Sequence, residues 1–461
     1  MAPVALGAPG DVQTGVAREI APGAASSSPE RLTVVGSTLF FTADHPSYGR
    51  ELWKTTSDGV TKMVKNIDPG TMSSNPEELT AVGSTLFFTA DDGTGDRELW
   101  KSDGTGPGTV RVRNINRVPN PDSNPNAASW PAELTEVNGR LFFAAQVGQQ
   151  PDPISGLQPA DDRELYVSDG TAAGTRRVAN ILSQGATHAA GSSNPSFLTS
   201  WGGGLYFRAV DQYGVRLWRS DGTRTGTVPV SAVPMAPEAL TVVGNLLFFT
   251  GSRGSYNREP WVTDGTAAGT RMLRDLDTFP GSPSNPDELT AVGDRVFFSA
   301  DVGGDRELYS SDGTTTGTRR VRNINLQRSS APSELTAFHD ELYFQATIDG
   351  NTELYRSDGT FAGTVLVKDI YNGGGSSPTE LTVVGDHLFF HALTSFNTSE
   401  SRPYDQLVRS DGTAAGTVPV GVAGPAGDGV PSGLGSFNGT LYYRDSSPGA
   451  GVELWKATIE P

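Results

Sequence analysis

Two short acidic loops contain the side chains best suited to bind a metal ion. Asp91, Asp92 and Asp96 lie in one loop, and Asp301 and Asp305 lie in the other. Calcium prefers carboxylate oxygens, but it needs roughly six to eight oxygen atoms that converge on one point. Neither loop has the ligand spacing of an EF-hand. Calcium is therefore the one cofactor that the sequence suggests, and otherwise we expect none.

Catalytic side chains are few. Histidine occurs at five positions, His45, His188, His339, His387 and His391. Only the last two are close in sequence, and without a nearby third ligand they give weak support for a metal site. Cysteine is absent, which excludes thiol nucleophiles and disulfides. The sequence contains neither a Gly-x-Ser-x-Gly elbow nor a glycine-rich phosphate loop. We therefore predict no catalytic residue.

Aromatic side chains in the loops could bind a ligand. Seven of them have no counterpart in the repeated strands described below, namely Tyr48, Trp130, Tyr213, Tyr256, Tyr371, Phe396 and Tyr404. Exposed rings flanked by Asn, Asp and Arg are typical of surfaces that bind glycans or peptides. The alternative is that several of these rings only anchor their own loops.

Charge and hydropathy restrict the partners. The net charge of −17 disfavours nucleic acid. The longest apolar runs, such as Leu246 to Phe249, are far shorter than the roughly 18 residues that cross a bilayer, so no membrane insertion is expected. The first residues lack the charged and apolar regions of a signal peptide, which fits either a mature exported protein or a cytoplasmic start. The oligomeric state stays open.

Three signatures recur along the chain and define repeated units. An apolar triplet, first seen as Leu39-Phe40-Phe41, has nine copies at spacings of 42 to 64 residues. Relatives of Glu51-Leu52-Trp53 also occur nine times. A Ser-Asp-Gly or Thr-Asp-Gly turn follows eight of them, at Asp58, Asp103, Asp169, Asp221, Asp264, Asp312, Asp358 and Asp411. These repeats replace the usual division of a long chain into domains of roughly 150 residues.

Each unit is predicted to contain four short strands. A proline precedes the first strand in all nine units, and proline suits the start of a strand because it lacks an N–H group. Two-residue turns such as Asn138-Gly139 join the first strand to the second. The second strand, as in Leu86 to Ala90, is apolar at consecutive positions, which indicates burial on both faces. The third strand contains Glu-Leu-Trp, and the fourth follows the Asp-Gly turn.

Four-stranded antiparallel units of this period are typical of an all-β fold, the β-propeller. A long β-solenoid is the competing architecture, and the two ends of the chain distinguish them. The last unit lacks its fourth strand, while Ala17 to Gly23 aligns with the fourth strand at Val64 to Gly70. We therefore predict nine four-stranded blades closed by an N-terminal strand that completes the last blade, with eight blades as the alternative. Residues 1–14 form a lead, the closing strand spans 15–23, and a single propeller domain covers 15–461 with its blades from about residue 29.

The stretch from Glu98 to Thr105, Glu-Leu-Trp-Lys-Ser-Asp-Gly-Thr, resembles the signature of bacterial ELWxxDGT repeat proteins. The likeness covers nearly the full length. It implies a secreted or cell-surface protein whose signature residues are structural, and it implies no particular activity. The sequence departs from the pattern at Arg216, at Pro260, at Gln406 to Val408 and after Asp58, where we expect local distortion.

The repeated polar residues are interpreted as structural. Each Asp-Gly locks a turn, and recurring pairs such as Arg97-Glu98 are expected to clamp one blade to the next. Carboxylates near the start of the first strands are expected to gather at the central channel, at Glu78, Glu133, Glu288, Glu334 and Glu380. There they would form either a cation-binding acidic mouth or a solvated group.

The long and irregular segments all fall on one face of the predicted ring, opposite the Asp-Gly turns. Functional residues commonly lie on loops held by a rigid scaffold. The sequence thus favours a non-enzymatic binding or adhesion module that presents this face to a carbohydrate or protein ligand. The alternatives are a propeller enzyme, either a glycoside hydrolase or a lyase that uses loop carboxylates, and a structural ring in a larger assembly.

Overall fold

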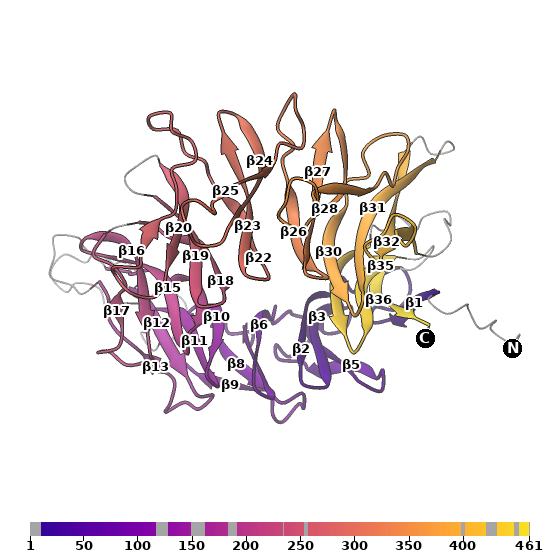
Figure 1. Cartoon of the computed structure of the whole chain (residues 1–461). Helices are drawn as coiled ribbons and strands as arrows, with labels where there is room; N and C mark the ends of the chain where they lie inside the picture. The colour runs from indigo at the N-terminus through magenta and orange to yellow at the C-terminus, as the bar shows by residue number, and fades with distance from the viewer. Residues whose placement is uncertain are drawn as a thin grey trace, which may run out of the picture.

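The protein is an all-β ring of nine four-stranded antiparallel sheets, as the computed structural model shows (Figure 1). The structure describes residues 11–116, 128–148, 162–182, 191–233, 235–252, 257–397, 402–420, 431–446 and 451–460. Within these ranges no helix long and apolar enough to cross a membrane is found. The prediction of a nine-bladed propeller is confirmed.

In blades one to eight the chain runs from the channel outward, one strand after the other. The inner strands are β2 (Glu30–Val35), β6 (Glu77–Val82), β10 (Ala132–Val137), β14 (Ser196–Trp201), β18 (Glu238–Val243), β22 (Asp287–Val292), β26 (Ser333–Phe338), β30 (Thr379–Val384) and β34 (Ser432–Phe437). The second strands are β3 (Thr38–His45), β7 (Thr85–Ala90), β11 (Arg140–Val147), β15 (Gly204–Asp211), β19 (Leu246–Ser252), β23 (Arg295–Val302), β27 (Glu341–Ile348), β31 (His387–Asn397) and β35 (Thr440–Ser446).

The third strands are β4 (Gly49–Thr56), β8 (Glu98–Ser102), β12 (Asp162–Ser168), β16 (Gly214–Ser220), β20 (Arg258–Thr263), β24 (Asp305–Ser311), β28 (Asn351–Ser357), β32 (Arg402–Ser410) and β36 (Val452–Ile459). The outer strands of blades one to eight are β5 (Thr61–Lys65), β9 (Val110–Arg113), β13 (Arg176–Arg177), β17 (Val228–Pro229), β21 (Arg271–Met272), β25 (Arg319–Arg322), β29 (Val365–Lys368) and β33 (Val418–Pro419). Blade nine takes β1 (Val12–Arg18) as its outer strand.

The N-terminal strand closes the ring. β1 pairs antiparallel with β36 from Val12 opposite Ile459 to Arg18 opposite Leu454. Behind it, the N–H groups of Ile20 and Ala21 donate to the Glu453 carboxylate at 2.8 and 3.0 Å. The strand begins at residue 12, three residues before the predicted range of 15–23. Closure leaves no open edge at either end of the array.

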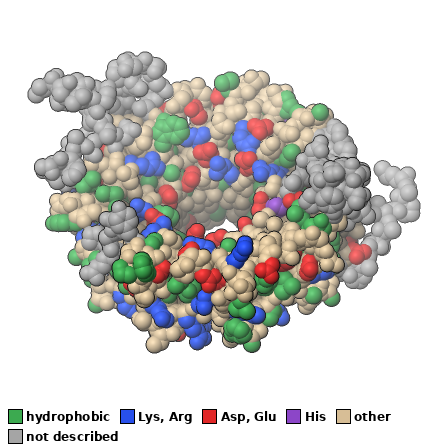
Figure 2. All heavy atoms as spheres, turned by 90° about the horizontal axis from the view of Figure 1, so that it is seen from above, with side chains coloured by type: hydrophobic (Ala, Val, Ile, Leu, Met, Phe, Trp, Pro, Cys, Tyr) green, Lys and Arg blue, Asp and Glu red, His purple; other side chains and the backbone are tan. Residues whose placement is uncertain are grey.

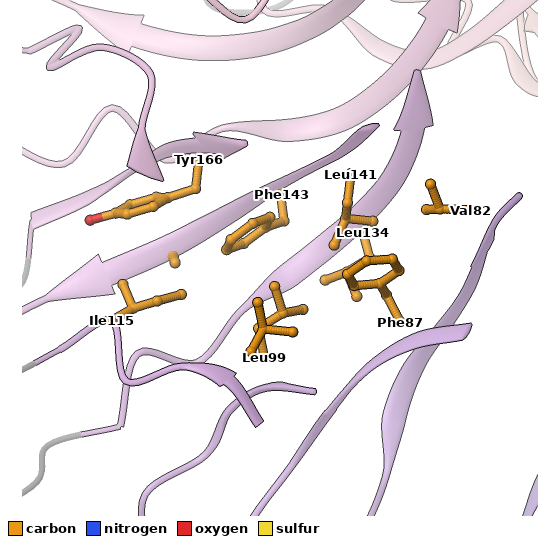
Figure 3. Close-up of a cluster of buried hydrophobic side chains, with 10 residues drawn as sticks. Val82, Phe87, Leu99, Ile115, Leu134, Leu141, Phe143 and Tyr166 are labelled. Atoms are coloured by element: carbon orange, nitrogen blue, oxygen red, sulfur yellow. The ribbon is translucent and has the colours of Figure 1, made fainter. Parts of the chain in front are cut away.

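The hydrophobic core lies between blades rather than inside one sheet. Leu141, Phe143 and Tyr166 of blade three pack against Phe87 and Leu99 of blade two (Figure 3). Comparable clusters join the other neighbouring blades. The consecutive apolar residues of the second strands are buried on both faces, as predicted, because each sheet has a neighbour on both sides.

Every inner strand contains a residue with left-handed backbone two positions after its proline. Glu78 has a φ of 57° and Glu334 a φ of 60°. The pairing register with the second strand shifts across this residue, for example between Glu77 and Thr80. Such a bulge bends a strand and interrupts its free edge. The nine inner strands therefore surround the channel without offering a continuous edge to a further strand.

Candidate functional site

The Asp-Gly turns are structural locks. In blade two, Asp103 Oδ1 accepts hydrogen bonds from Thr105 N at 2.8 Å and Thr105 Oγ1 at 2.7 Å. Thr109 Oγ1 donates to Thr105 O at 2.7 Å and lies 2.8 Å from Ser102 Oγ. The same contacts recur in six other blades, around Asp169, Asp221, Asp264, Asp312, Asp358 and Asp411. The threonine donors lower the pKa of these aspartates. The turn interpretation is confirmed.

The glutamate of the Glu-Leu-Trp signature clamps seven of the nine blades to the segment that leads into the next. In blade two the buried Glu98 accepts from Ser129 Oγ at 2.6 Å and from Asn116 N at 3.4 Å. Seven blades share this serine contact, through Glu51, Glu98, Glu164, Glu259, Glu307, Glu353 and Glu453. Burial raises the pKa of Glu51, Glu98 and Glu164 to about 7, and the hydrogen-bond donors oppose that shift.

The arginine before this glutamate makes its side-chain hydrogen bonds inside its own blade. Arg97 Nη2 donates to Asn75 O at 2.7 Å and Arg97 Nη1 donates to Thr89 Oγ1 at 3.0 Å. Arg306 makes the same two contacts, to Asn285 O at 3.0 Å and to Ser299 Oγ at 2.9 Å. The clamp interpretation is therefore right for the glutamate, whereas the hydrogen bonds of the arginine stay inside its own blade.

The five predicted channel carboxylates bind backbone N–H groups of the next inner strand. Glu288 Oε2 accepts from Leu335 N at 3.0 Å, and Glu334 Oε2 accepts from Glu380 N at 2.8 Å. Glu78 and Glu133 make the equivalent contact at 3.3 Å. Figure 2 shows acidic and basic side chains gathered around the central opening. These carboxylates are clamps at the channel wall, which is a structural role that the sequence did not predict.

The acidic loops hold no ready metal site. Asp91 Oδ1 accepts from the N–H groups of Gly93 and Gly95 at 2.9 and 3.0 Å. Arg111 Nη1 lies 3.1 Å from the buried Asp96 and 3.5 Å from Asp92. In the second loop, Asp301 accepts from Gly304 N at 2.8 Å and Asp305 pairs with Arg320 at 3.1 Å. Among the described residues, no group of three or more His, Cys, Asp or Glu is placed to hold an ion. The arginines take the place that a cation would need.

The predicted aromatic residues do not form one site. Tyr48, Trp130 and Tyr213 are exposed at 39%, 52% and 65% and belong to different parts of the ring. Tyr371 and Tyr404 are half-buried. Tyr256 and the side chain of Phe396 lie outside the described residues. Among the described rings, no ring contact joins two members of this set.

Several of these rings contact neighbouring side chains. The ring of Tyr48 lies 4.7 Å from the ring of His45 in the same hairpin. The Arg97 guanidinium lies 5.9 Å from the Trp130 ring, and the Arg216 guanidinium lies 5.3 Å from the Tyr213 ring. Cations over aromatic faces stabilise such contacts by about 0.5–1 kcal/mol at exposed sites.

Blade eight departs from the repeat next to the channel. Thr379 Oγ1 lies 2.7 Å from His391 Nε2 and 3.4 Å from His391 Nδ1, and Nδ1 also lies 3.2 Å from Asp405 Oδ1. The three residues come from the neighbouring strands β30, β31 and β32, and Thr379 pairs directly with His391. Burial lowers the pKa of His391, but the hydrogen bond to Asp405 and the charges of Glu380 and Glu334 outweigh it and raise the pKa overall. An imidazole that contacts both a hydroxyl and a carboxylate can accept a proton from the hydroxyl.

Sequence reasoning missed Thr379 and Asp405, although a signal was available. Aligning the units places Thr379 at the position of Glu77, and His391 at that of Thr89. Asp405 takes the position of Arg97, the residue before the signature glutamate. Blade eight thus has a threonine where blade two has Glu77 and an aspartate where blade two has Arg97. The imidazole of His391 lies between the two.

A cavity of about 280 Å³ on the Asp-Gly face of blade four was also not predicted. It is lined by Trp201, Tyr206, Arg219 and the turn at Asp221. The centres of the Trp201 and Tyr206 rings lie 4.7 Å apart. Three consecutive glycines at 202–204 leave the space that side chains would otherwise fill.

Comparison with known proteins gave matches among solved structures alone. No family model matches the sequence, and no curated protein matches it either. A puromycin hydrolase structure matches with 14% identity and a TM-score of 0.45, over 97% of this chain and 63% of that one. A puromycin-hydrolysing peptidase of Mycobacterium tuberculosis matches with 13% identity and a TM-score of 0.44, over 93% of this chain and 62% of that one.

A prolyl endopeptidase structure matches with 14% identity and a TM-score of 0.40, over 96% of this chain and 54% of that one. The chain thus spans less than two thirds of the length of these proteins. The expectation of a non-enzymatic binding or adhesion module is corrected here, because the matched structures are named as hydrolases and peptidases. The resemblance to ELWxxDGT repeat proteins stays a prediction.

Proposed function

We propose that the chain is the peptide-admitting ring of a peptide-hydrolysing protein. The observation that supports this is the construction of the channel wall, in which the polar backbone groups of each inner strand are bound by the neighbouring blade. Glutamates accept the N–H groups, as in the contact of Glu288 with Leu335 N. Threonines donate to the carbonyl groups, as in the bonds from Thr290 Oγ1 to Leu335 O and from Thr80 Oγ1 to Leu134 O, at 3.1 and 3.3 Å.

A wall of this kind suits an extended chain that passes through rather than one that stays. Exposed strand edges capture peptides by adding them as a further strand. Here the left-handed residue in every inner strand interrupts the edge, and the contacts between blades satisfy the groups that an added strand would use. A peptide in the channel would therefore interact mainly through its side chains and its charged ends.

The charges at the rim suit a chain with opposite charges at its two ends. The residue before the signature glutamate is an arginine in blades one, two, three, five and six, and in two of these blades Arg50 pairs with Glu30 at 2.8 Å and Arg258 with Glu238 at 2.6 Å. In blades seven and eight, Glu334 and Glu380 lie beside His391 instead. Complementary charges of this kind steer and orient a ligand more than they add affinity.

Site-specific photo-crosslinking tests the proposal. Phe197 occupies the inner-strand position that Glu133 has in the preceding blade, and it is 38% exposed. A photoreactive phenylalanine analogue at residue 197 should crosslink to dye-labelled, unstructured peptides. The matched control carries the same analogue at Phe361, which is 67% exposed in the Asp-Gly turn of blade seven.

The proposal predicts crosslinking at residue 197. An excess of unlabelled peptide should suppress this crosslinking, and a folded protein of similar charge should not suppress it. Crosslinking at residue 361 should be weak and insensitive to competitor. Equal labelling at both positions, or no labelling at residue 197, would overturn the proposed passage.

A further inference from the structure

Thr379, His391 and Asp405 form a polar series in blade eight that is partly open to solvent. The side chains of His391 and Asp405 are 16% and 27% exposed. Thr379 Oγ1 lies 2.7 Å from His391 Nε2 and 3.4 Å from His391 Nδ1, and Nδ1 also lies 3.2 Å from Asp405 Oδ1. Thr379 follows Pro378 at the start of β30, so its hydroxyl lies at the channel end of the sheet.

Packing does not require these three residue types. In blade two the same positions hold Glu77, Thr89 and Arg97, joined by ordinary polar contacts. In blade seven they hold Ser333, Gln345 and Thr352, and Gln345 Nε2 donates to Ser333 Oγ at 2.9 Å. Ion-paired residues in blade two and neutral residues in blade seven therefore both fit these three positions. Neither set contains an imidazole between a hydroxyl and a carboxylate.

Two backbone N–H groups of the next blade converge on one oxygen atom of Glu380. Gly433 N and Leu434 N, in β34 of blade nine, donate to Glu380 Oε2 at 2.6 and 3.2 Å. Gly433 has a φ of 65°, a conformation that lets successive N–H groups point the same way. Glu380 is the residue after Thr379. Paired N–H groups that hold a negative oxygen are the arrangement that stabilises the oxyanion of acyl transfer.

We propose that blade eight contains an acyl-transfer site in which Thr379 is the nucleophile, His391 is the general base and Asp405 positions the imidazole. Thr379 Oγ1 attacks the carbonyl carbon of an ester or a peptide, and its proton passes to His391 Nε2. The oxyanion displaces the Glu380 carboxylate from the N–H groups of Gly433 and Leu434. His391 then gives the proton to the leaving alcohol or amine as its bond to carbon breaks.

The second half of the reaction uses water. Water attacks the acyl-threonine ester, its proton passes to His391, and Thr379 Oγ1 recovers a proton as the acid leaves. This proposal rests on the proposed function only for the choice of peptides as the natural substrate. An activated ester tests the site itself, whether or not peptides pass through the channel.

The titrating groups around His391 give the reaction a pH signature. Asp405 on β32, Glu380 on β30 and Glu334 on β26 together raise the pKa of His391 against the effect of burial. Because only the neutral imidazole accepts a proton, acylation should increase as pH rises through that pKa. Asp405→Asn removes the nearest negative charge, so it should slow acylation and move the increase to lower pH. A residue with only a structural role would not move this profile.

Intact-mass analysis of the full chain with p-nitrophenyl acetate is the decisive experiment. We expect one acetyl group on the peptide that contains Thr379, and at least a tenfold loss of p-nitrophenol release in Thr379→Ala and in His391→Gln. Thr379→Ser should keep the reaction. Ser333→Ala is the matched control, because it removes the hydroxyl at the same strand position of blade seven.

Glu380→Ala distinguishes the proposed acyl-transfer site from the structural contact that Glu380 makes with blade nine. It frees the N–H groups of Gly433 and Leu434, so acylation at Thr379 should be at least as fast as in the unaltered chain. Glu334→Ala removes the equivalent clamp without freeing these two groups, and it controls for loosening of the ring. Absence of an adduct at Thr379, or equal release from Thr379→Ala in a protein with an unchanged melting temperature, would overturn the proposal.

Discussion

The buried glutamates of the Glu-Leu-Trp signature should make the stability of the ring depend on pH. Burial raises the pKa of Glu51, Glu98 and Glu164 to about 7, against a value of 4.5 for a free glutamate. Between these values the folded chain holds protons that the unfolded chain has released. The free energy of unfolding therefore decreases as pH rises through this window, and the stabilisation is fully present only below pH 4.5.

Glu98→Gln tests this effect at one position. Each such group contributes up to about 1.4 kcal/mol per pH unit to the slope of stability against pH, or roughly 3 kcal/mol across the window. Glutamine keeps the shape of the side chain and does not titrate, so the variant should lose that share of the slope. Blade eight already carries Gln406 at the equivalent position, which indicates that the side chain fits.

Urea unfolding of the full chain between pH 5 and pH 8 measures the slope. The control is Glu136→Gln, the same change near the end of β10, where the Glu136 carboxylate accepts from Gly139 N in the turn to β11. Parallel curves for the unaltered chain and Glu98→Gln would refute the reasoning. They would mean that the donors from Ser129 and Asn116, rather than burial, decide the charge of Glu98.

Three further outcomes follow from the fold. Deletion of residues 1–23 should lower the melting temperature markedly, since it removes β1 and the Ile20 and Ala21 donors to Glu453, and an unchanged temperature would contradict closure by this strand. Leu308→Ala, at a fully buried position, should cost about 2–5 kcal/mol in urea unfolding, whereas a loss under about 1 kcal/mol would contradict tight packing between blades. Calcium and EDTA should give the same melting temperature, because Arg111 and Arg320 already pair with the loop aspartates.

The sequence predicted the ring because each feature of a blade is repeated nine times. Proline at the strand start, glycine in the tight turn and the apolar second strand each have a direct local cause. The alignment of Ala17 to Gly23 with Val64 to Gly70 also held in detail. Ile20 and Ala21 donate to Glu453 as Ile67 and Asp68 donate to Glu51.

The candidate site was much less predictable, because it depends on side chains that face each other across strands. Thr379 and Asp405 are separated by 26 residues, and the register of β31 between them decides that both reach His391. The left-handed residue in each inner strand was also not predicted. It falls on Glu, Arg, Phe and Ala alike, and therefore comes from the geometry of the ring rather than from residue preference.

Departures from the repeat differ in what they leave open to solvent. In blade four, Arg216 replaces the signature glutamate, pairs with Asp211 and lies 5.6 Å from the Trp218 ring, so the change is compensated inside the blade. Gln406 of blade eight accepts from Thr394. The series of Thr379, His391 and Asp405 is also compensated internally, but its imidazole and carboxylate remain partly exposed beside the channel. Of the three departures it alone places groups that can exchange protons where a substrate could reach them, and for that reason we place the chemistry there.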